Sequence, residues 1–131
     1  MKKIFAGLDI GTSSVKAGLF DLDGHLLASA AVAIPLYSPF QGWAEQDPQD
    51  WWSAACQTLR QVMEKADSDE VIALGLSGQC PGHVMVDHSG NPLGRAIIWR
   101  DQRAQEEARW LAESIPPESP TTARLNPHFL K

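Results

Sequence analysis

The chain has few cysteines, no excess of positive charge and no long apolar run. Its two cysteines, Cys56 and Cys80, lie far apart and lack the spacing of a metal site, so we expect free thiols in a reducing cytoplasm. A formal net charge of −5 argues against nonspecific binding to nucleic acid, which needs a basic surface. No apolar run has the length of a membrane span. We therefore expect a cytoplasmic protein with neither a nucleic acid nor a membrane as partner.

The composition that is present is typical of one modest globular domain, with 44% apolar and 21% charged residues among 131. Apolar runs at residues 3–8, 15–21 and 26–34 predict three strands. The first run is short and ends at Asp9, which is typical of a strand rather than a signal peptide. The DLDG turn before the third run is a hairpin signal. The short connections predict an antiparallel meander.

The segment DPQDWW predicts the start of a helix. Asp47 is a good N-cap, Pro48 suits the first helical position, and apolar residues then recur at helical spacing. We expect Trp51 and Trp52 to anchor this helix in the core. Cys56 lies on the same face and is expected to be a small buried apolar side chain.

The second half of the chain predicts a mixed sheet with flanking helices, and so an α/β fold. Residues 71–76 are apolar on both faces, which favours a central, parallel strand. Residues 83–87 and 95–99 predict two strands joined by the turn HSGN, and residues 102–114 predict a second helix. The final segment TTARLNPHFLK contains no closing element, so we expect the fold to be incomplete.

The stretch DIGTSSVK places a carboxylate and three hydroxyls at the turn between the first two strands. Gly11 lets the backbone approach a phosphate closely, and consecutive N–H groups in a tight turn form an anion-binding concavity. Asp9 suits Mg²⁺, which prefers oxygen ligands, and Lys16 adds a positive charge near the β- or γ-phosphate. The candidate phosphate-binding hydroxyls are those of Thr12, Ser13 and Ser14. The alternative is an ordinary turn, in which such side chains bond the local backbone.

Four stretches together resemble the N-terminal domain of the FGGY carbohydrate kinases, especially their xylulokinase-like branch. GLDIGTSSVKAGLFDLDG resembles the first phosphate motif of the sugar-kinase, Hsp70 and actin superfamily. GWAEQDPQDWW, ALGLSGQCPGH and RAIIWRDQRA follow it in the order found in the family. The resemblance covers nearly the whole chain and implies a ribonuclease-H-like fold.

The resemblance also implies ATP-dependent phosphorylation of a sugar or sugar-alcohol hydroxyl, with Mg²⁺ as cofactor and a pentulose as the favoured substrate. In such kinases two domains enclose a cleft, with the sugar mainly on the N-terminal domain and ATP mainly on the C-terminal one. Residues 1–131 then correspond to the first part of the sugar-binding domain, and the ATP-binding domain is a missing partner. The general-base aspartate is expected beyond Lys131, so we expect no catalytic residue in this chain and little activity from it alone.

The loop SGQCPGH is one candidate for sugar binding, because the carboxyl end of a strand in an α/β sheet is a favoured ligand site. Gln79 is a candidate contact. Related kinases carry Met-His or Arg-Glu directly after this glutamine, whereas this chain has Cys80 and Pro81. Neither side chain bonds a hydroxyl well, which puts xylulose, and more firmly glycerol, in doubt. His83 either replaces the usual histidine or starts the next strand and caps a backbone group.

The stretch WRDQR is the second candidate for sugar binding. Trp99 either stacks on the apolar face of a sugar or belongs to the core. Asp101 either accepts two sugar hydroxyls, as a strong ionised acceptor, or caps the following helix, or does both. Arg103 either fixes Asp101 or contacts the ligand.

Three hypotheses follow for the function. The first is a carbohydrate kinase fragment, and the second is an ATP-driven chaperone or filament protein of the same superfamily. The W-x-D-x-R motif argues against the second, because it has no role there. The third is a truncated remnant that only binds a sugar or associates with itself as a homodimer through an unpaired sheet edge.

Overall fold

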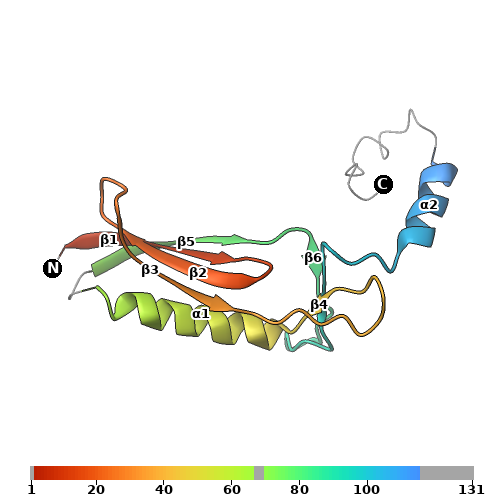
Figure 1. Ribbon diagram of the computed structural model, residues 1–131, viewed down its shortest axis with the longest axis horizontal. Coiled ribbons are helices and arrows are strands. Elements are labelled where there is room, and N and C mark those ends of the chain that lie inside the picture. The colour runs from red at the N-terminus through yellow and green to blue at the C-terminus, as the bar shows by residue number, and fades with distance from the viewer. Residues whose placement is uncertain (1, 67–69, 116–131) are drawn as a thin grey trace.

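The computed structural model of this chain describes residues 2–66 and 70–115, and its main layer is a four-stranded sheet (Figure 1). The strands stand in the order β3-β2-β1-β5. Their bounds are Lys3–Ile10 for β1, Ser14–Phe20 for β2, Leu26–Ala33 for β3 and Glu70–Gly78 for β5. Strands β1, β2 and β3 pair antiparallel in succession, and β5 runs parallel to β1. The antiparallel meander predicted from the sequence is confirmed.

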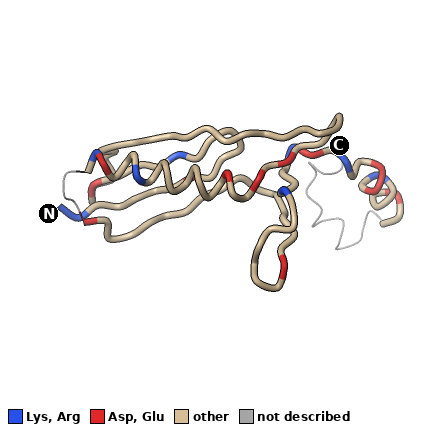
Figure 2. Tube along the Cα trace, turned by 90° about the horizontal axis from the view of Figure 1, so that it is seen from below, with Lys and Arg blue, Asp and Glu red and all other residues tan. Residues whose placement is uncertain are grey.

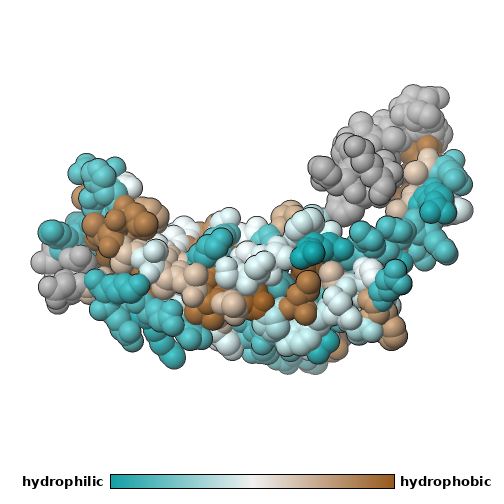
Figure 3. Space-filling model, in the orientation of Figure 1, coloured by the Kyte–Doolittle hydropathy of each residue, from teal (hydrophilic) through white to brown (hydrophobic). Residues whose placement is uncertain are grey.

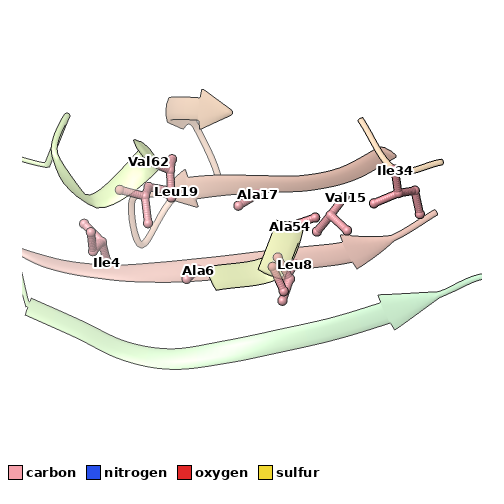
Figure 4. Packing of buried hydrophobic residues seen from close by; sticks show 10 residues of the cluster. Ile4, Ala6, Leu8, Val15, Ala17, Leu19, Ile34, Ala54 and Val62 are labelled. Atoms are coloured by element: carbon pink, nitrogen blue, oxygen red, sulfur yellow. The ribbon is translucent and has the colours of Figure 1, made fainter. Parts of the chain in front are cut away.

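The helix α1 (Pro48–Met63) covers one face of this sheet, and the core lies between them (Figures 1 and 4). Alternate residues of a strand point to opposite faces, so every second side chain of β1 and β2 reaches the helix. The buried apolar side chains of these two strands are those of Ile4, Ala6, Leu8, Val15, Ala17 and Leu19. They pack against Ala54 and Val62 of α1. The intervening residues are left on the opposite face.

The start of α1 follows the predicted signals. The Asp47 carboxylate accepts a backbone N–H two residues later at 2.8 Å, and Pro48 is the first helical residue. Trp51 packs against the core as predicted, but Trp52 is 69% exposed, so the prediction that it anchors the helix is wrong. The next helical residue is rotated by about 100° around the axis, which turns Trp52 away from the sheet. Cys56 is half-buried rather than buried.

Strand β5 lies at the edge of the sheet and, within residues 2–66 and 70–115, pairs only with β1. Its parallel direction is as predicted, but the prediction of a central position is wrong. Its apolar side chains are correspondingly open to solvent, with Ile72, Leu74 and Leu76 43%, 47% and 72% exposed. Apolar side chains reach the surface at several places on the body of the molecule (Figure 3). The described residues therefore do not bury the apolar side chains of β5, although its sequence is apolar on both faces.

A small three-stranded sheet lies beyond the carboxyl ends of β1 and β5 (Figure 1). It has the order β4-β7-β6, with β4 at Glu45–Gln46, β7 at Ala96–Ile98 and β6 at Gly82–His83. The two predicted strands of the second half thus form, but both are shorter than expected. The predicted turn between them is present, since the Gly90 N–H donates to the Asp87 carbonyl at 3.0 Å.

The second helix, α2 (Gln105–Ser114), starts three residues later than the predicted residue 102 and has no buried residue. It extends away from both sheets (Figure 1). Neither helix in the described part of the chain is long and apolar enough to cross a membrane. The predicted absence of a closing element concerns the segment TTARLNPHFLK, which lies outside the described residues.

Candidate functional site

Two loops that the sequence singled out separately meet at one end of the main sheet. The GTSS loop (residues 11–14) follows β1, and the QCPG loop (residues 79–82) follows β5. Because β1 and β5 are parallel, both loops leave the sheet at the same end, where these strands finish. The pairing of the two strands continues into the QCPG loop, since the Gln79 N–H donates to the Ile10 carbonyl at 2.9 Å. The carboxyl ends of parallel strands are where α/β sheets bind ligands.

The GTSS loop is a compact turn that favours glycine at its first position. The Gly11 N–H closes the turn on the Ser14 carbonyl at 3.1 Å. A Cβ atom on Gly11 would lie 3.0 Å from that carbonyl oxygen and 3.6 Å from Asp9 Oδ2. The Ile34 N–H also holds the loop through the Ser13 carbonyl at 3.1 Å. The backbone of the loop is therefore anchored on both sides.

Asp9 and Lys16 are cross-strand partners on the sheet face opposite α1. Both line a hollow of about 460 Å³ whose floor includes Gly7, Gly18 and Gly75, which are also register partners. Among the described residues, neither the Asp9 carboxylate nor the Lys16 ammonium forms a hydrogen bond or ion pair. The hydroxyls of Ser13 and Ser14 are likewise without a partner in residues 2–66 and 70–115. These groups are therefore available to a ligand.

Gln46 is a functional candidate that the sequence reasoning missed. It is fully buried and its side chain makes four hydrogen bonds. Its Nε2 donates to the carbonyls of Thr12 and Pro35 at 2.7 and 3.2 Å. Its Oε1 accepts from Trp51 Nε1 at 3.0 Å and from Gln79 Nε2 at 2.6 Å. The only sequence signal was its place in the stretch GWAEQDPQDWW, directly before the helix cap.

The Thr12 hydroxyl joins three predicted site residues from distant parts of the sequence. It donates to Gln79 Oε1 at 3.0 Å and accepts from Trp99 Nε1 at 2.9 Å. A residue expected on the phosphate side is thereby bonded to two residues expected on the sugar side. Trp99 is 51% exposed, so the interpretation of this side chain as core is wrong.

The side chain of Asp101 is only 5% exposed, and its carboxylate holds two chain segments together. Arg103 binds it through Nε and a terminal nitrogen at 2.8 and 2.7 Å, and the N–H groups of Ala44 and Arg103 add bonds of 2.7 and 2.9 Å. Burial raises the pKa of Asp101, but the bonds from the Arg103 side chain and from these N–H groups outweigh it and leave the pKa at about 2. The carboxylate is therefore ionised at neutral pH.

The predicted role of Asp101 as the cap of the second helix is wrong. The N-cap position of α2 is Ala104, and no side chain caps this helix. The carboxylate is instead used by the Arg103 N–H, two residues before the first helical residue, and by Ala44 in the loop before α1. The helix starts too late for Asp101 to reach its first free N–H groups.

Arg103 links the same carboxylate to the segment before α1. Its guanidinium also donates to Glu45 Oε1 at 2.8 Å and lies 3.6 Å from the centre of the Trp43 ring. The bond to Asp101 raises the pKa of Arg103. Arg95 lies over the ring of Tyr37 at 3.7 Å and also reaches Glu45, at 3.9 Å. Acidic and basic residues accordingly stand side by side in this part of the chain (Figure 2).

The remaining predicted residues of the QCPG loop face solvent. Cys80 and Pro81 are exposed, and within the described residues Cys80 forms no disulfide. His83 belongs to β6 and pairs with Ile97, which agrees with its interpretation as the start of the next strand. Its side chain is exposed.

A group of three possible metal ligands lies at the far end of β2 from Ser14, in an exposed turn. Ligand atoms of Asp21, Asp23 and His25 lie within 4.8 Å of one another. Asp21 already accepts the N–H groups of His25 and Asp23 at 2.9 and 3.0 Å and bonds the His25 ring at 3.0 Å. These bonds from His25 lower the pKa of Asp21. The hydrogen bonds within this turn thus already occupy the Asp21 carboxylate.

Residues 4–125 match the N-terminal domain of the FGGY family of carbohydrate kinases. This chain belongs to that family. The ribonuclease-H-like fold expected for an FGGY chain is confirmed by its likeness to the crystal structure of xylulose kinase from Rhodospirillum rubrum. That likeness has a TM-score of 0.82 and 32% identity, and covers 88% of this chain and 24% of the kinase.

Curated relatives of this chain include kinases with different named substrates. The xylulose kinase of Staphylococcus epidermidis (strain ATCC 12228 / FDA PCI 1200) is 32% identical over 115 residues, 86% of this chain and 23% of that protein. Glycerol kinase 1 of Saccharolobus solfataricus is 34% identical over 110 residues, 83% of this chain and 22% of that protein. The FGGY chain thus spans about a quarter of the length of these relatives.

Proposed function

We propose that this FGGY chain is the first part of the sugar-binding domain of an ATP-dependent kinase. The kinase phosphorylates a hydroxyl of a sugar or sugar alcohol, with a pentulose favoured. The observation that carries the proposal is the joining of the GTSS loop to the sugar side, because the Thr12 hydroxyl bonds both Gln79 and Trp99. Phosphoryl transfer depends on holding donor and acceptor groups in one geometry.

The phosphate side of the proposed site consists of Asp9, Gly11, Lys16 and the hydroxyls of Ser13 and Ser14. The residues present fit Mg²⁺, since the half-buried Asp9 carboxylate ends a strand and has no partner in the described part of the chain. When bound there, Mg²⁺ would neutralise charge on the transferring phosphate. Lys16 stands across from Asp9 on the neighbouring strand and is placed to attract the same phosphate.

The sugar side of the proposed site consists of Gln79, Trp99 and the exposed surface of the QCPG loop. The Trp99 indole is half exposed and can cover the apolar face of a sugar ring or chain. Asp101 carries four hydrogen bonds on its two carboxylate oxygens, which matches their acceptor capacity. Sugar hydroxyls would have to replace these donors, so we propose that Asp101 and Arg103 hold the site in shape.

We expect residues 1–131 alone to have little kinase activity. FGGY relatives are about four times longer, and we propose that the general base and the adenosine pocket lie in the part that this chain does not match. A full rate requires both substrates and the base to be positioned together. Clear ATP-dependent phosphorylation of any sugar by this chain would contradict this part of the proposal.

Calorimetric titration tests the proposed function. The chain is titrated with pentuloses, hexoses, polyols and sugar acids, and then with ATP and Mg²⁺. We expect one sugar class to bind, and we expect Trp99→Ala to abolish that binding. Trp52→Ala is the matched control, because Trp52 is also exposed but lies on α1, away from both loops. Binding by Trp99→Ala equal to wild type, or the absence of any sugar binding, would overturn the assignment of a sugar site to this chain.

A second candidate function, self-association, is favoured by the exposed edge of β5. This strand pairs on one side only within the described residues and exposes three large apolar side chains. An unpaired strand edge is a template for pairing with another chain. Sedimentation of the chain over a range of concentrations tests this candidate.

A further inference from the structure

We infer that Gln46 fixes the direction of the hydrogen bonds between the GTSS and QCPG loops and thereby positions the Trp99 indole. Gln46 is thus a positioning residue, acting through Gln79 and Thr12. The effect of Gln46 on sugar binding rests on the proposed function, whereas the assignment of donors and acceptors does not depend on it.

The orientation of the Gln46 amide follows from its partners. Its Nε2 end faces two backbone carbonyls, those of Thr12 and Pro35, which can only accept. Its Oε1 end faces the indole N–H of Trp51, which can only donate. Rotating the amide by half a turn would place oxygen against both carbonyls and N–H against N–H. Because the side chain is fully buried, no solvent could compensate.

The orientation of Gln79 follows from that of Gln46. Gln46 Oε1 can only accept, so the Gln79 atom that faces it at 2.6 Å must be the donor Nε2. The opposite atom of the same amide, Gln79 Oε1, is then an acceptor and faces the Thr12 hydroxyl at 3.0 Å. The Thr12 proton must therefore point toward Gln79.

The Thr12 hydroxyl consequently has only acceptor capacity left. That capacity is used by Trp99, whose indole N–H donates at 2.9 Å. The donor and the acceptor of each hydrogen bond from Gln46 through Gln79 and Thr12 to Trp99 are thus determined by the carbonyls of Thr12 and Pro35, which fix the Gln46 amide. Thr12 has no proton for a phosphate oxygen, so only Ser13 and Ser14 remain as hydroxyl donors of the GTSS loop. The Thr12 side chain belongs to the sugar side.

The path ends at Trp99, a side chain that is partly open to solvent. Trp99 is 51% exposed, and its bond to Thr12 is the one side-chain hydrogen bond that it makes within residues 2–66 and 70–115. Buried polar networks in which every group is satisfied make a local structure rigid and unique. The geometry points to a buried glutamine that orients an exposed aromatic surface across two loops.

Nuclear magnetic resonance of the five indole N–H groups in the ¹⁵N-labelled chain tests this inference. Trp99→Phe identifies the Trp99 signal. Thr12→Val removes the hydroxyl at constant shape, and we expect the Trp99 N–H to shift and to exchange with solvent about fivefold faster. The Trp51 signal should not move, since Trp51 bonds Gln46 directly. Thr12→Ser keeps the hydroxyl and should restore the Trp99 signal. An unchanged Trp99 signal in Thr12→Val would overturn the inference.

A second variant tests the direction of the bonds without relying on a deletion. In Gln79→Glu, a protonated carboxyl can donate to Gln46 and accept from Thr12, as the amide does, whereas a carboxylate cannot donate. We expect displaced signals of Trp51 and Trp99 at pH 8, where the carboxylate cannot donate to Gln46, and a return toward the wild-type signals as the pH is lowered and the carboxyl takes up a proton. Signals at pH 8 equal to those of wild type would show that the path does not run in the assigned direction.

The same signals separate the inference from the proposed function. Titrating the labelled wild-type chain with a pentulose asks whether sugar moves the Trp99 signal. If no sugar does so while Thr12→Val still displaces Trp99, the proposed sugar site fails and the hydrogen-bond path stands. If Thr12→Val leaves Trp99 in place while sugar binds, the path fails and the proposed function stands.

Discussion

The Thr12 hydroxyl donates to Gln79 Oε1 at 3.0 Å, although 67 positions separate the two residues in the sequence. This bond joins the loop after β1 to the loop after β5 at the carboxyl ends of two parallel strands. The bond is possible because β1 and β5 pair with each other, so the loops that follow these two strands are neighbours in space. A direct hydrogen bond therefore links the loop of the proposed phosphate side to the loop of the proposed sugar side.

Asp9→Asn is expected to lower turnover about 10²- to 10³-fold in the longer kinase that we propose, with sugar binding nearly intact. The amide keeps the shape but removes the charge that suits Mg²⁺. Steady-state kinetics over a range of sugar and Mg²⁺ concentrations measures this. A loss of sugar affinity equal to the loss of turnover would count against the assigned role.

Gly11→Ala is expected to destabilise the chain by about 1–3 kcal/mol, because its Cβ would lie 3.0 Å from the Ser14 carbonyl oxygen. Gly94→Ala is the control, since a Cβ at Gly94 meets nothing within 4 Å. Urea unfolding of the three proteins gives the two differences in free energy. Equal values for the two variants would show that the GTSS turn adapts to a side chain.

Asp101 is expected to stabilise the chain in a pH-dependent way. Its pKa in the fold is about 2, against about 3.9 in an unfolded chain. A depressed carboxyl pKa contributes stability that is fully present above about pH 4 and is lost as the pH falls toward 2. The contribution corresponds to about 2–3 kcal/mol.

The variant Asp101→Asn tests this pH dependence. We expect it to be less stable than wild type at pH 7, with the difference shrinking between pH 4 and pH 2. Asp23→Asn, an exposed aspartate in the β2–β3 turn, carries the same change of charge and serves as control. Unfolding by urea at several pH values provides the measurement, and a difference independent of pH would contradict the assigned pKa.

Leu76→Lys is expected to reduce self-association of the chain. Leu76 is 72% exposed on the edge strand β5, and a charge there opposes pairing with a second strand. Leu22→Lys is the control, because Leu22 is 59% exposed in a turn away from this edge. Sedimentation equilibrium compares the association constants. If both variants associate as wild type does, the β5 edge is not the contact.

Local signals in the sequence were enough to predict much of the fold. Alternating apolar residues and the DLDG turn predict the meander, because both depend on the chain's own geometry over a few residues. Asp47 and Pro48 mark the start of α1 for the same reason, since a cap acts on its next two or three residues. The glycine of the GTSS loop was also recognisable, because close backbone approach at Gly11 limits which residues fit.

Tertiary structure alone decided the connections between these parts. Whether apolar β5 is central or an edge depends on which strands lie beside it, and the sequence of β5 is the same in either case. The glutamine of EQDP has no local feature that tells an exposed amide from a buried one with four hydrogen bonds. Hydrogen bonds act over about 3 Å in space, and their partners here come from segments that only the folded sheet brings to that distance.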